Sequence, residues 1–496
     1  MTLPAGSNNL DIAIIGAGFG GIGAAIRLQQ AGFDDFLIFE RSGDVGGTWH
    51  HNTYPGCVCD VPSHLYSFSF ALNPEWSNTF SAQEEIWAYL RDCANRYGLM
   101  PKLRLNHDVT GAAWDDEARR WRLTTSHGDY TARVLVAATG SLSEPAVPNI
   151  TGLDTFAGTT FHSARWRHDH DLNGRRVAVI GTGASAAQFV PKIQPDVDHL
   201  TLFQRTPAWV MPRRRRRITR VERAIYRHVT GATRMVRTAL YWERECWAVG
   251  FLHPQINRLG QRLSERHLRQ QVSDPGLRAA LRPDYVLGCK RVLLSNDYWA
   301  SLDRPNVEVV TEPIARVDPS GISTADGNRY AVDTIIFGTG FRVTDPPIMQ
   351  RIKGRDGQTL ADAWTPTMHT YLGTTVHGFP NLFVLLGPNT GLGHSSVVLM
   401  IEAQLRQVIK ALHHLRRTGG GAIEPTSQAQ HRHTERIDRA MTGTVWATGG
   451  CSSWYLDASG RNSVIWPGYV TPFRWRLTRF RATDYTTSGG AADAAQ

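Results

Sequence analysis

Short apolar runs followed by glycine clusters and helical patterns recur along this chain. Residues 11–15 (DIAII) form an apolar run typical of a buried strand, and apolar positions with helical spacing follow through residue 32. A second apolar run covers residues 36–40 (FLIFE). The same order returns at residues 175–205, with RRVAVI, GTGASA, a helical stretch and LTLFQR. The pattern predicts an α/β protein with two Rossmann-like units, each built as strand, turn, helix and strand.

Each unit has small residues where a dinucleotide-binding turn needs them. They are Gly16, Gly18 and Gly21 in the first unit, and Gly181, Gly183 and Ala186 in the second. Such a turn brings a helix N-terminus against a pyrophosphate, while an acid at the end of the next strand accepts ribose hydroxyls. Glu40 is that acid in the first unit. The sequence therefore predicts two nucleotide sites, as hydride transfer between two cofactors requires.

The two units differ where the first has its acid. Gly16 to Glu40 spans 24 positions and Gly181 to Gln204 spans 23, so Gln204 replaces the carboxylate. An arginine follows in both units, Arg41 in the first and Arg205 in the second. A carboxylate repels a ribose 2′-phosphate, whereas an amide and a guanidinium accept one. We expect FAD at the first site and NADPH, rather than NADH, at the second.

Breaks in the pattern indicate how the chain divides. Pro145 and Pro148 follow a buried strand at residues 134–138, and residues 333–340 (DTIIFGTG) resemble the end of that strand (VLVAATG). Residues 378–402 have the pattern of a strand, a glycine-rich loop and a helix. We expect an FAD-binding domain at 1–150 and 366–485, an NADPH-binding domain at 151–217 and 286–365, a helical insertion at 218–285 and a disordered tail at 486–496.

Composition and charge exclude several classes of protein. Lys and Arg exceed Asp and Glu by ten, which suits two anionic dinucleotides but also a nucleic acid or a membrane surface. The run Arg213–Arg217 is interpreted as a solvated loop, because no nucleic-acid-binding module surrounds it. No apolar run is long enough to span a membrane and no signal pattern begins the chain, so we expect a cytoplasmic protein. The six cysteines are expected to be reduced, and Cys57 and Cys59 are too close together for half of a zinc site, so we expect no metal. The sequence sets no oligomeric state.

The segment between the two units carries a recognisable pattern. Phe156, Gly158, His162 and Trp166 match Phe-x-Gly-x-x-x-His-x-x-x-Trp. This resembles the fingerprint of type I Baeyer–Villiger monooxygenases, which use FAD and NADPH to insert oxygen beside a carbonyl. Arg167 stands where that family has Pro or Asp. The related flavin-containing monooxygenases have Tyr or Phe at the position of Trp166.

The resemblance implies roles for further residues. Asp60 matches the aspartate of the family's YPGxxCD loop, and Arg205 the arginine of its QRTPxW segment. Arg291 matches the catalytic arginine, oriented by Asp60, and Lys290 would join Arg205 at the 2′-phosphate. Trp49 would lie near the nicotinamide. The other residues expected at the cofactors are Gly47, Thr48, Ser185, Gln188, Thr206 and Asn389.

The chemistry supports this reading on physical grounds. A flavin C4a-peroxide that attacks a ketone or aldehyde must stay anionic, and a guanidinium stays charged at any working pH and stabilises the developing oxyanion. The expected product is an ester or lactone.

Alternatives are oxidation of sulfur or amine nitrogen, a flavin reductase without oxygenation, and a nucleic-acid-binding flavoprotein. Asp60 could instead cap a turn, Arg291 could be a surface ion-pair member, and His162 is preferred as a linker residue that bonds backbone over a proton donor.

Overall fold

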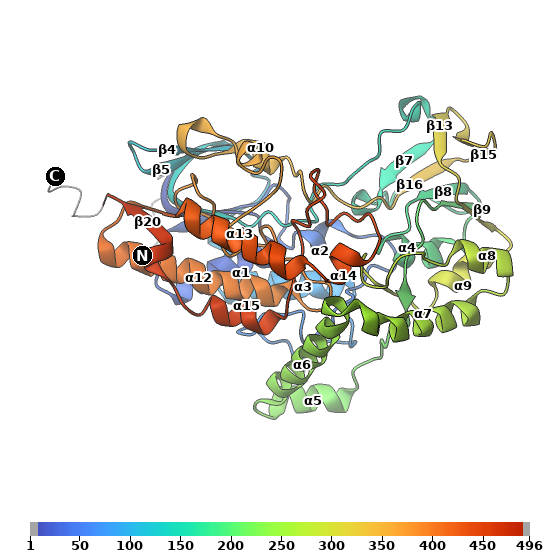
Figure 1. Ribbon diagram of the computed structural model, residues 1–496, viewed down its shortest axis with the longest axis horizontal. Coiled ribbons are helices and arrows are strands. Elements are labelled where there is room, and N and C mark those ends of the chain that lie inside the picture. The colour runs from blue at the N-terminus through green and yellow to red at the C-terminus, as the bar shows by residue number, and fades with distance from the viewer. Residues whose placement is uncertain (1–7, 490–496) are drawn as a thin grey trace.

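Two sheets with parallel strands at their centres form the molecule, with helices on both sides (Figure 1). A computed structural model describes residues 8–489. The predicted fold class, α/β with two Rossmann-like units and a helical insertion, is confirmed. No helix between residues 8 and 489 combines the length and the apolar character needed to cross a membrane.

The first sheet contains eight strands and is built around β1. Its order is β17-β4-β5-β6-β1-β2-β3, with β18 paired to β6. The strands β1, β2, β3, β6 and β18 are parallel, while β4 and β5 form an antiparallel extension. The bounds are β1 (Asn9–Ile15), β2 (Phe36–Phe39), β3 (Leu103–Arg104), β4 (Val109–Asp115), β5 (Arg120–Thr125), β6 (Gly128–Ala137), β17 (Ile352–Lys353) and β18 (Leu382–Val384).

Alternating residues of this sheet enter two separate cores. Ile12 and Ile14 of β1 face one core, and Ala13 and Ile15 face the other. Because successive strand side chains point to opposite faces, a strand covered on both sides must be apolar throughout. Residues 12–15 (IAII) meet this requirement, and all four are buried.

The second sheet is entirely parallel, with the order β12-β9-β8-β16-β7. Its strands are β7 (Thr159–His162), β8 (Arg176–Ile180), β9 (His199–Phe203), β12 (Val307–Val310) and β16 (Thr334–Phe337). Three small sheets complete the strands: β10 (Val210–Met211) with β11 (Leu293–Leu294); β13 (Ile314–Asp318), β14 (Gly321–Thr324) and β15 (Arg329–Ala331); and β19 (Ala422–Pro425) with β20 (Tyr485–Ser488).

Helices cover both sheets, and α1 packs on α12 beside the first sheet. Those of the first sheet and its surroundings are α1 (Phe19–Gln30), α2 (Thr48–His51), α3 (Gln83–Arg96), α10 (Ile348–Arg351), α11 (Leu360–Ala363), α12 (Val397–Thr418), α13 (Ser427–Met441), α14 (Val445–Thr448) and α15 (Val470–Arg476). Those of the second sheet and the insertion are α4 (Ala186–Ile193), α5 (Arg220–His228), α6 (Ala232–Leu252), α7 (Asn257–Gln271), α8 (Pro275–Ala280) and α9 (Tyr298–Leu302).

A one-turn helix, α2, places Thr48 and Trp49 directly after Gly47. One expectation from the sequence needs correction. The tail expected to be disordered from residue 486 instead continues as β20 to Ser488, because Thr486 and Thr487 pair with β19 in an antiparallel ladder. The rest of that expectation falls on residues 490–496, outside the described part of the chain.

Replacing Gly21 by Ala should destabilise the first unit. An added Cβ would lie 1.8 Å from the carbonyl oxygen of Gly16, which is part of the turn itself and cannot move away. We expect a loss of about 3 kcal/mol in the free energy of unfolding and weaker retention of flavin, measured by thermal denaturation and by absorbance. Gly111→Ala is the matched control, since its Cβ would meet nothing closer than 3.8 Å. Equal melting temperatures for the two variants would contradict the prediction.

Candidate active site

The first glycine triplet forms a tight turn between β1 and α1. Gly16 has a φ of +98°, and a Cβ there would lie 2.6 Å from the carbonyl oxygen of Ala138. Gly18, in contrast, would place a Cβ no closer than 3.6 Å to Gly47. The middle glycine is therefore open to a ligand, as close approach of a pyrophosphate to the backbone requires. Gly18 begins α1 without a side-chain cap, which leaves helix amides for an anion.

Glu40 stands at the end of β2, beside this turn. Its carboxylate accepts hydrogen bonds from the amides of Ala17 at 2.8 Å and Ser42 at 3.0 Å. These bonds fix a buried acid at the point where a ribose would lie. The residues of the first unit thus fit the adenosine half of FAD.

The second triplet repeats the turn. Gly181 has a φ of +107°, and its Cβ would lie 2.5 Å from the carbonyl oxygen of Gly338, as that of Gly16 would from Ala138. A Cβ at Gly183 would meet only Gly338, at 3.8 Å, so this glycine is also open. Ser185 precedes α4 without capping it through its side chain, and Ala186 is fully buried in the first turn.

A polar pocket of about 330 Å³ lies at the end of β9. Arg205 and Thr206 line it, together with Arg282 and Asp284 from the chain after α8. Lys290 lies near Arg205: burial lowers its pKa, and the positive charge of Arg205 lowers it further. A pair of neighbouring cations, of which Arg205 lines the polar pocket, suits a phosphate dianion.

Three predicted polar residues bind the chain itself. The Gln204 amide donates to the carbonyl oxygen of Ala280 at 2.8 Å. Gln188 accepts from the Tyr54 hydroxyl and the Val58 amide, both at 3.1 Å, and donates to the Val58 carbonyl at 2.9 Å. Gln204 also lines the polar pocket, so its expected part in phosphate binding stays a prediction. Gln188 links α4 to the loop that precedes Asp60.

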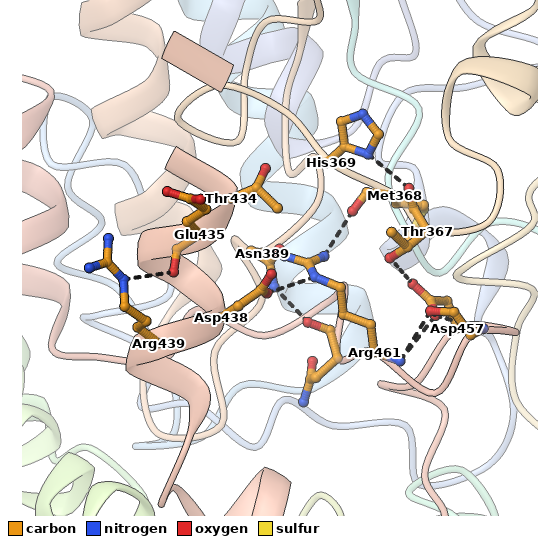
Figure 2. A network of polar contacts seen from close by, with 12 residues as sticks. Thr367, Met368, His369, Asn389, Thr434, Glu435, Asp438, Arg439, Asp457 and Arg461 are labelled. Atoms are coloured by element: carbon orange, nitrogen blue, oxygen red, sulfur yellow. Dashed lines mark hydrogen bonds and ion pairs between the residues drawn. The ribbon is translucent and has the colours of Figure 1, made fainter. Parts of the chain in front are cut away.

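Asn389 behaves in the same way at the other end of the chain. Its amide donates to the carbonyl oxygens of Asn462 and Ile465, and its oxygen accepts from Arg461 at 3.2 Å. Arg461 also reaches Asp438 at 2.7 Å and the Met368 carbonyl at 3.0 Å, as Figure 2 shows. This network holds the loop after β18 against the C-terminal segment, so Asn389 fixes the position of that loop.

The two predicted catalytic residues meet. Arg291 donates from Nε to Asp60 Oδ2 and from Nη2 to Asp60 Oδ1, both at 2.8 Å, in a bidentate ion pair. Burial tends to raise the pKa of Asp60, but the Arg291 charge outweighs it and holds that pKa below its usual value. The Asp60 charge in turn raises the pKa of Arg291. Both groups are therefore charged throughout the physiological range.

Arg291 is held on both sides along the chain. Two residues after it, β11 pairs with β10, and two residues before it Cys289 forms a disulfide with Cys451. The expectation that all six cysteines are reduced is therefore wrong for this pair, because Cys451 comes from the distant C-terminal segment, 162 positions away. Cys57, Cys59, Cys93 and Cys246 are free.

Aromatic side chains surround the ion pair. Burial raises the pKa of Tyr455 to about 12, and the Arg291 charge acts in the opposite direction. Tyr66 accepts a hydrogen bond at 3.2 Å from the indole of Trp49, the residue expected near the nicotinamide. Burial raises the pKa of Tyr66, whose titration is also sensitive to Cys59 and Asp60. The side chain of Arg291 is 33% exposed, so the group is partly shielded from water, which strengthens its charge interactions.

The side chains of His162, Trp166 and Arg167 in the linker contact a backbone amide, aromatic rings and a neighbouring carboxylate. His162 is buried, its Nδ1 accepts from the Ala164 amide at 3.1 Å, and burial lowers its pKa to about 4. The preferred interpretation of His162 as a residue that bonds backbone agrees with this neutral ring. Trp166 packs on Phe161 and Phe189. Arg167, which departs from the family pattern, forms an exposed ion pair with Asp169.

Several site residues were missed from the sequence. Tyr455 was seen only as one of many C-terminal aromatics, and Arg213, whose charge also lowers the pKa of Asp60, was counted as part of a solvated run. Arg213 donates from its backbone to Asn296 and from its side chain to the Leu294 carbonyl. Arg282 carried no signal at all. It lies three residues before Tyr285, whose hydroxyl donates to the Pro207 carbonyl, and this contact brings Arg282 to the pocket.

Two glycine cradles and a partly buried arginine–aspartate pair define a flavoprotein with a second dinucleotide site. Residues 13–234 match the family described as pyridine nucleotide-disulphide oxidoreductase. The chain is 53% identical over 478 residues to a Baeyer–Villiger monooxygenase of Streptomyces coelicolor, covering 96% of this chain and 92% of that protein. A Baeyer–Villiger monooxygenase of Pseudomonas aeruginosa is 48% identical over 485 residues, covering 97% and 92%. The structure of cyclohexanone monooxygenase from Rhodococcus sp. Phi1 bound to NADP⁺ superposes with a TM-score of 0.86 at 29% identity, covering 98% of this chain and 100% of that one. The chain belongs to the Baeyer–Villiger monooxygenases.

The cysteine pairing can be counted directly. We expect the protein, denatured without reductant, to expose four thiols and, after reduction, six, because Cys289 and Cys451 are joined and the other four are not. The measurement is titration with a thiol reagent. A Cys451→Ser variant should show five thiols in both conditions. Six thiols in the unreduced wild-type protein would contradict the pairing.

Proposed function

We propose that this protein is an FAD- and NADPH-dependent monooxygenase that inserts one atom of O₂ beside the carbonyl of a ketone or aldehyde, giving an ester or lactone. The observation that carries the proposal is the bidentate pair between Asp60 and Arg291, which is partly buried beside Tyr455 and Tyr66. Membership of the family and the likeness to a cyclohexanone monooxygenase support it. The partners proposed are a small carbonyl substrate and O₂.

The chain's own residues divide the binding work. We assign FAD to the cradle of Gly16, Gly18 and Gly21, with Glu40 at its ribose, and NADPH to the cradle of Gly181 and Gly183. Arg205, Thr206 and Lys290 would hold the 2′-phosphate at the polar pocket. When bound and reduced by NADPH, FAD supplies activated oxygen. Gly47, Thr48 and Trp49 would bound the space where the two rings meet.

Arg291 supplies the charge that the reaction needs. Oxygen attack on a carbonyl places negative charge on the carbonyl oxygen, and a fixed guanidinium stabilises that charge without reorganising. Asp60 keeps two of the guanidinium's N–H groups occupied, so the group points in one direction and leaves its remaining N–H donors for the substrate side. The surrounding aromatics limit water.

We further propose domain boundaries and a location. The FAD-binding domain takes residues 1–150 and 366–485, the NADPH-binding domain 151–217 and 286–365, and the insertion 218–285. Sheet membership supports this division. Among the described residues, every strand of the first sheet lies within the proposed FAD-binding ranges except β17 (Ile352–Lys353). A cytoplasmic location is proposed because NADPH is kept reduced inside cells.

Arg205→Ala should weaken NADPH much more than NADH. The lost charge-assisted contact to the 2′-phosphate is worth about 1.5–3 kcal/mol, or roughly ten- to a hundredfold in KM. Steady-state oxidation of both coenzymes gives the comparison. Arg41→Ala is the matched control, because Arg41 follows Glu40 in the first unit and pairs with Glu144. If Arg205→Ala changed both coenzymes equally, Arg205 would not be the residue that reads the phosphate.

Arg291→Ala should retain FAD and NADPH yet form little ester. Removing one well-placed charge donor typically costs about a hundred- to a thousandfold in turnover. Thioether oxidation, which puts no negative charge on a carbonyl oxygen, should suffer less, and Asp60→Ala should show a milder form of the same pattern. The measurements are stopped-flow reduction and reoxidation of flavin, with ester formed per NADPH consumed.

The control for Arg291→Ala is Arg176→Ala. Arg176 forms a similar two-bond pair with Asp333, but at the surface. It should leave ester yield unchanged. Wild-type ester yield and rate in Arg291→Ala would remove this arginine from the mechanism and favour oxidation of sulfur or amine nitrogen.

A further inference from the structure

The positive charge of this protein is concentrated in one segment. Residues 213–271 contain fifteen arginines, no lysine and four acidic residues, an excess of eleven, while the whole chain has an excess of ten. The remainder is therefore close to neutral. Two bound dinucleotides do not account for this distribution, because both glycine cradles and the polar pocket lie outside the segment.

Most of these arginines have no acidic partner. Within residues 8–489, only Arg216 and Arg227 of the fifteen form ion pairs, with Glu222 and Glu75. Arg258 and Arg262, on the outer side of α7, are exposed and form none with the described carboxylates. An uncompensated cationic surface attracts an anionic partner.

Apolar side chains share this surface. On α6, Met235 is 73% exposed and Trp242 55%, whereas Arg237, Arg244 and Glu245 of the same helix are buried. The helix thus buries three charged side chains while it exposes large apolar ones beside the exposed Arg234 and Glu243, unlike an ordinary surface helix. Val221 on α5 and Leu259 on α7 are also largely exposed.

The three helices lie together at one margin of the molecule. In Figure 1, α5, α6 and α7 form its lower edge, with the connection between α5 and α6 at the tip, away from both sheets. Trp475 of α15 is also exposed, and α15 contacts α6 through the pair Tyr241 and Thr471. We call the outer sides of α5, α6 and α7 the basic-apolar face.

We propose that the basic-apolar face binds the surface of an anionic lipid bilayer. Interfacial helices combine arginines, which reach lipid phosphates, with Trp, Met and Leu, which enter the acyl boundary. A nucleic acid would leave the apolar side chains without a partner. A second copy of the chain would bring two strongly cationic faces together. The bilayer alone satisfies both the charge and the apolar stripe, without a membrane-spanning helix.

Flotation of the FAD-loaded enzyme with lipid vesicles tests the proposal. We expect binding to vesicles of phosphatidylcholine with phosphatidylglycerol to exceed binding to phosphatidylcholine alone by at least about tenfold, and to weaken as salt is raised. Equal binding to both vesicles, or none, overturns the proposal. Tighter binding to duplex DNA at physiological salt, or a dimer seen by sedimentation that Trp242→Ser disrupts, also overturns it.

Paired variants separate the two contributions. Arg258→Glu with Arg262→Glu should lower binding to anionic vesicles by at least about tenfold, and Met235→Ser with Trp242→Ser should lower it severalfold. The charge control is Arg417→Glu with Arg439→Glu, and the apolar control is Met100→Ser, all exposed positions outside the face. Unchanged melting temperature and NADPH oxidation in solution show that each variant is folded. A control pair that lowers binding as much as its partner would overturn the assignment to this face.

Discussion

The ion pair between Asp60 and Arg291 joins two halves of the chain that are 231 positions apart. Both side chains are partly buried, and a charge withdrawn from water is costly without its partner, so the pair depends on the docking of the two dinucleotide units. The surrounding structure secures both partners. Gln188 of the second unit bonds the loop before Asp60, and the strand pairing of β11 with β10 fixes the chain after Arg291. The docking of the two units and the position of the Arg291 charge therefore depend on each other, and a shift between the units would change both.

Local pattern predicted the parts of the fold that local physics determines. The strand β1 had to be apolar throughout because it is covered on both faces, and its sequence shows this directly. The turns at Gly16 and Gly181 require positive φ, so glycines mark them. The partners of Cys289 and Asn389 could not be predicted, since they lie in the C-terminal segment and no spacing rule connects them. Gln204 lies at the polar pocket as its place in the unit predicts, while its bond to the Ala280 carbonyl could not be predicted from the sequence.

The two units use one backbone solution and differ in their side chains. At each turn, the first glycine lies against the end of a neighbouring strand, Ala138 in one unit and Gly338 in the other. This contact leaves no room for a side chain, which explains why both units have glycine at this position. No such contact fixes the position of Glu40, and the second unit has Gln204 there. On the proposed assignment, the nucleotide that each unit prefers depends on the residues at the ends of β2 and β9, where a side chain can change without disturbing the turn.

A buried arginine, Arg237, connects α6 to the loop that carries Asp60. Arg237 donates to the carbonyl oxygens of His64 at 2.8 Å and Leu65 at 3.1 Å, in the loop that begins with Asp60. Apolar packing tolerates sliding, but hydrogen bonds of this kind are directional and break when their partners move. The position of α6 and that of the loop carrying Asp60 are therefore coupled through Arg237, so a ligand that displaced α6 would also displace the proposed active site.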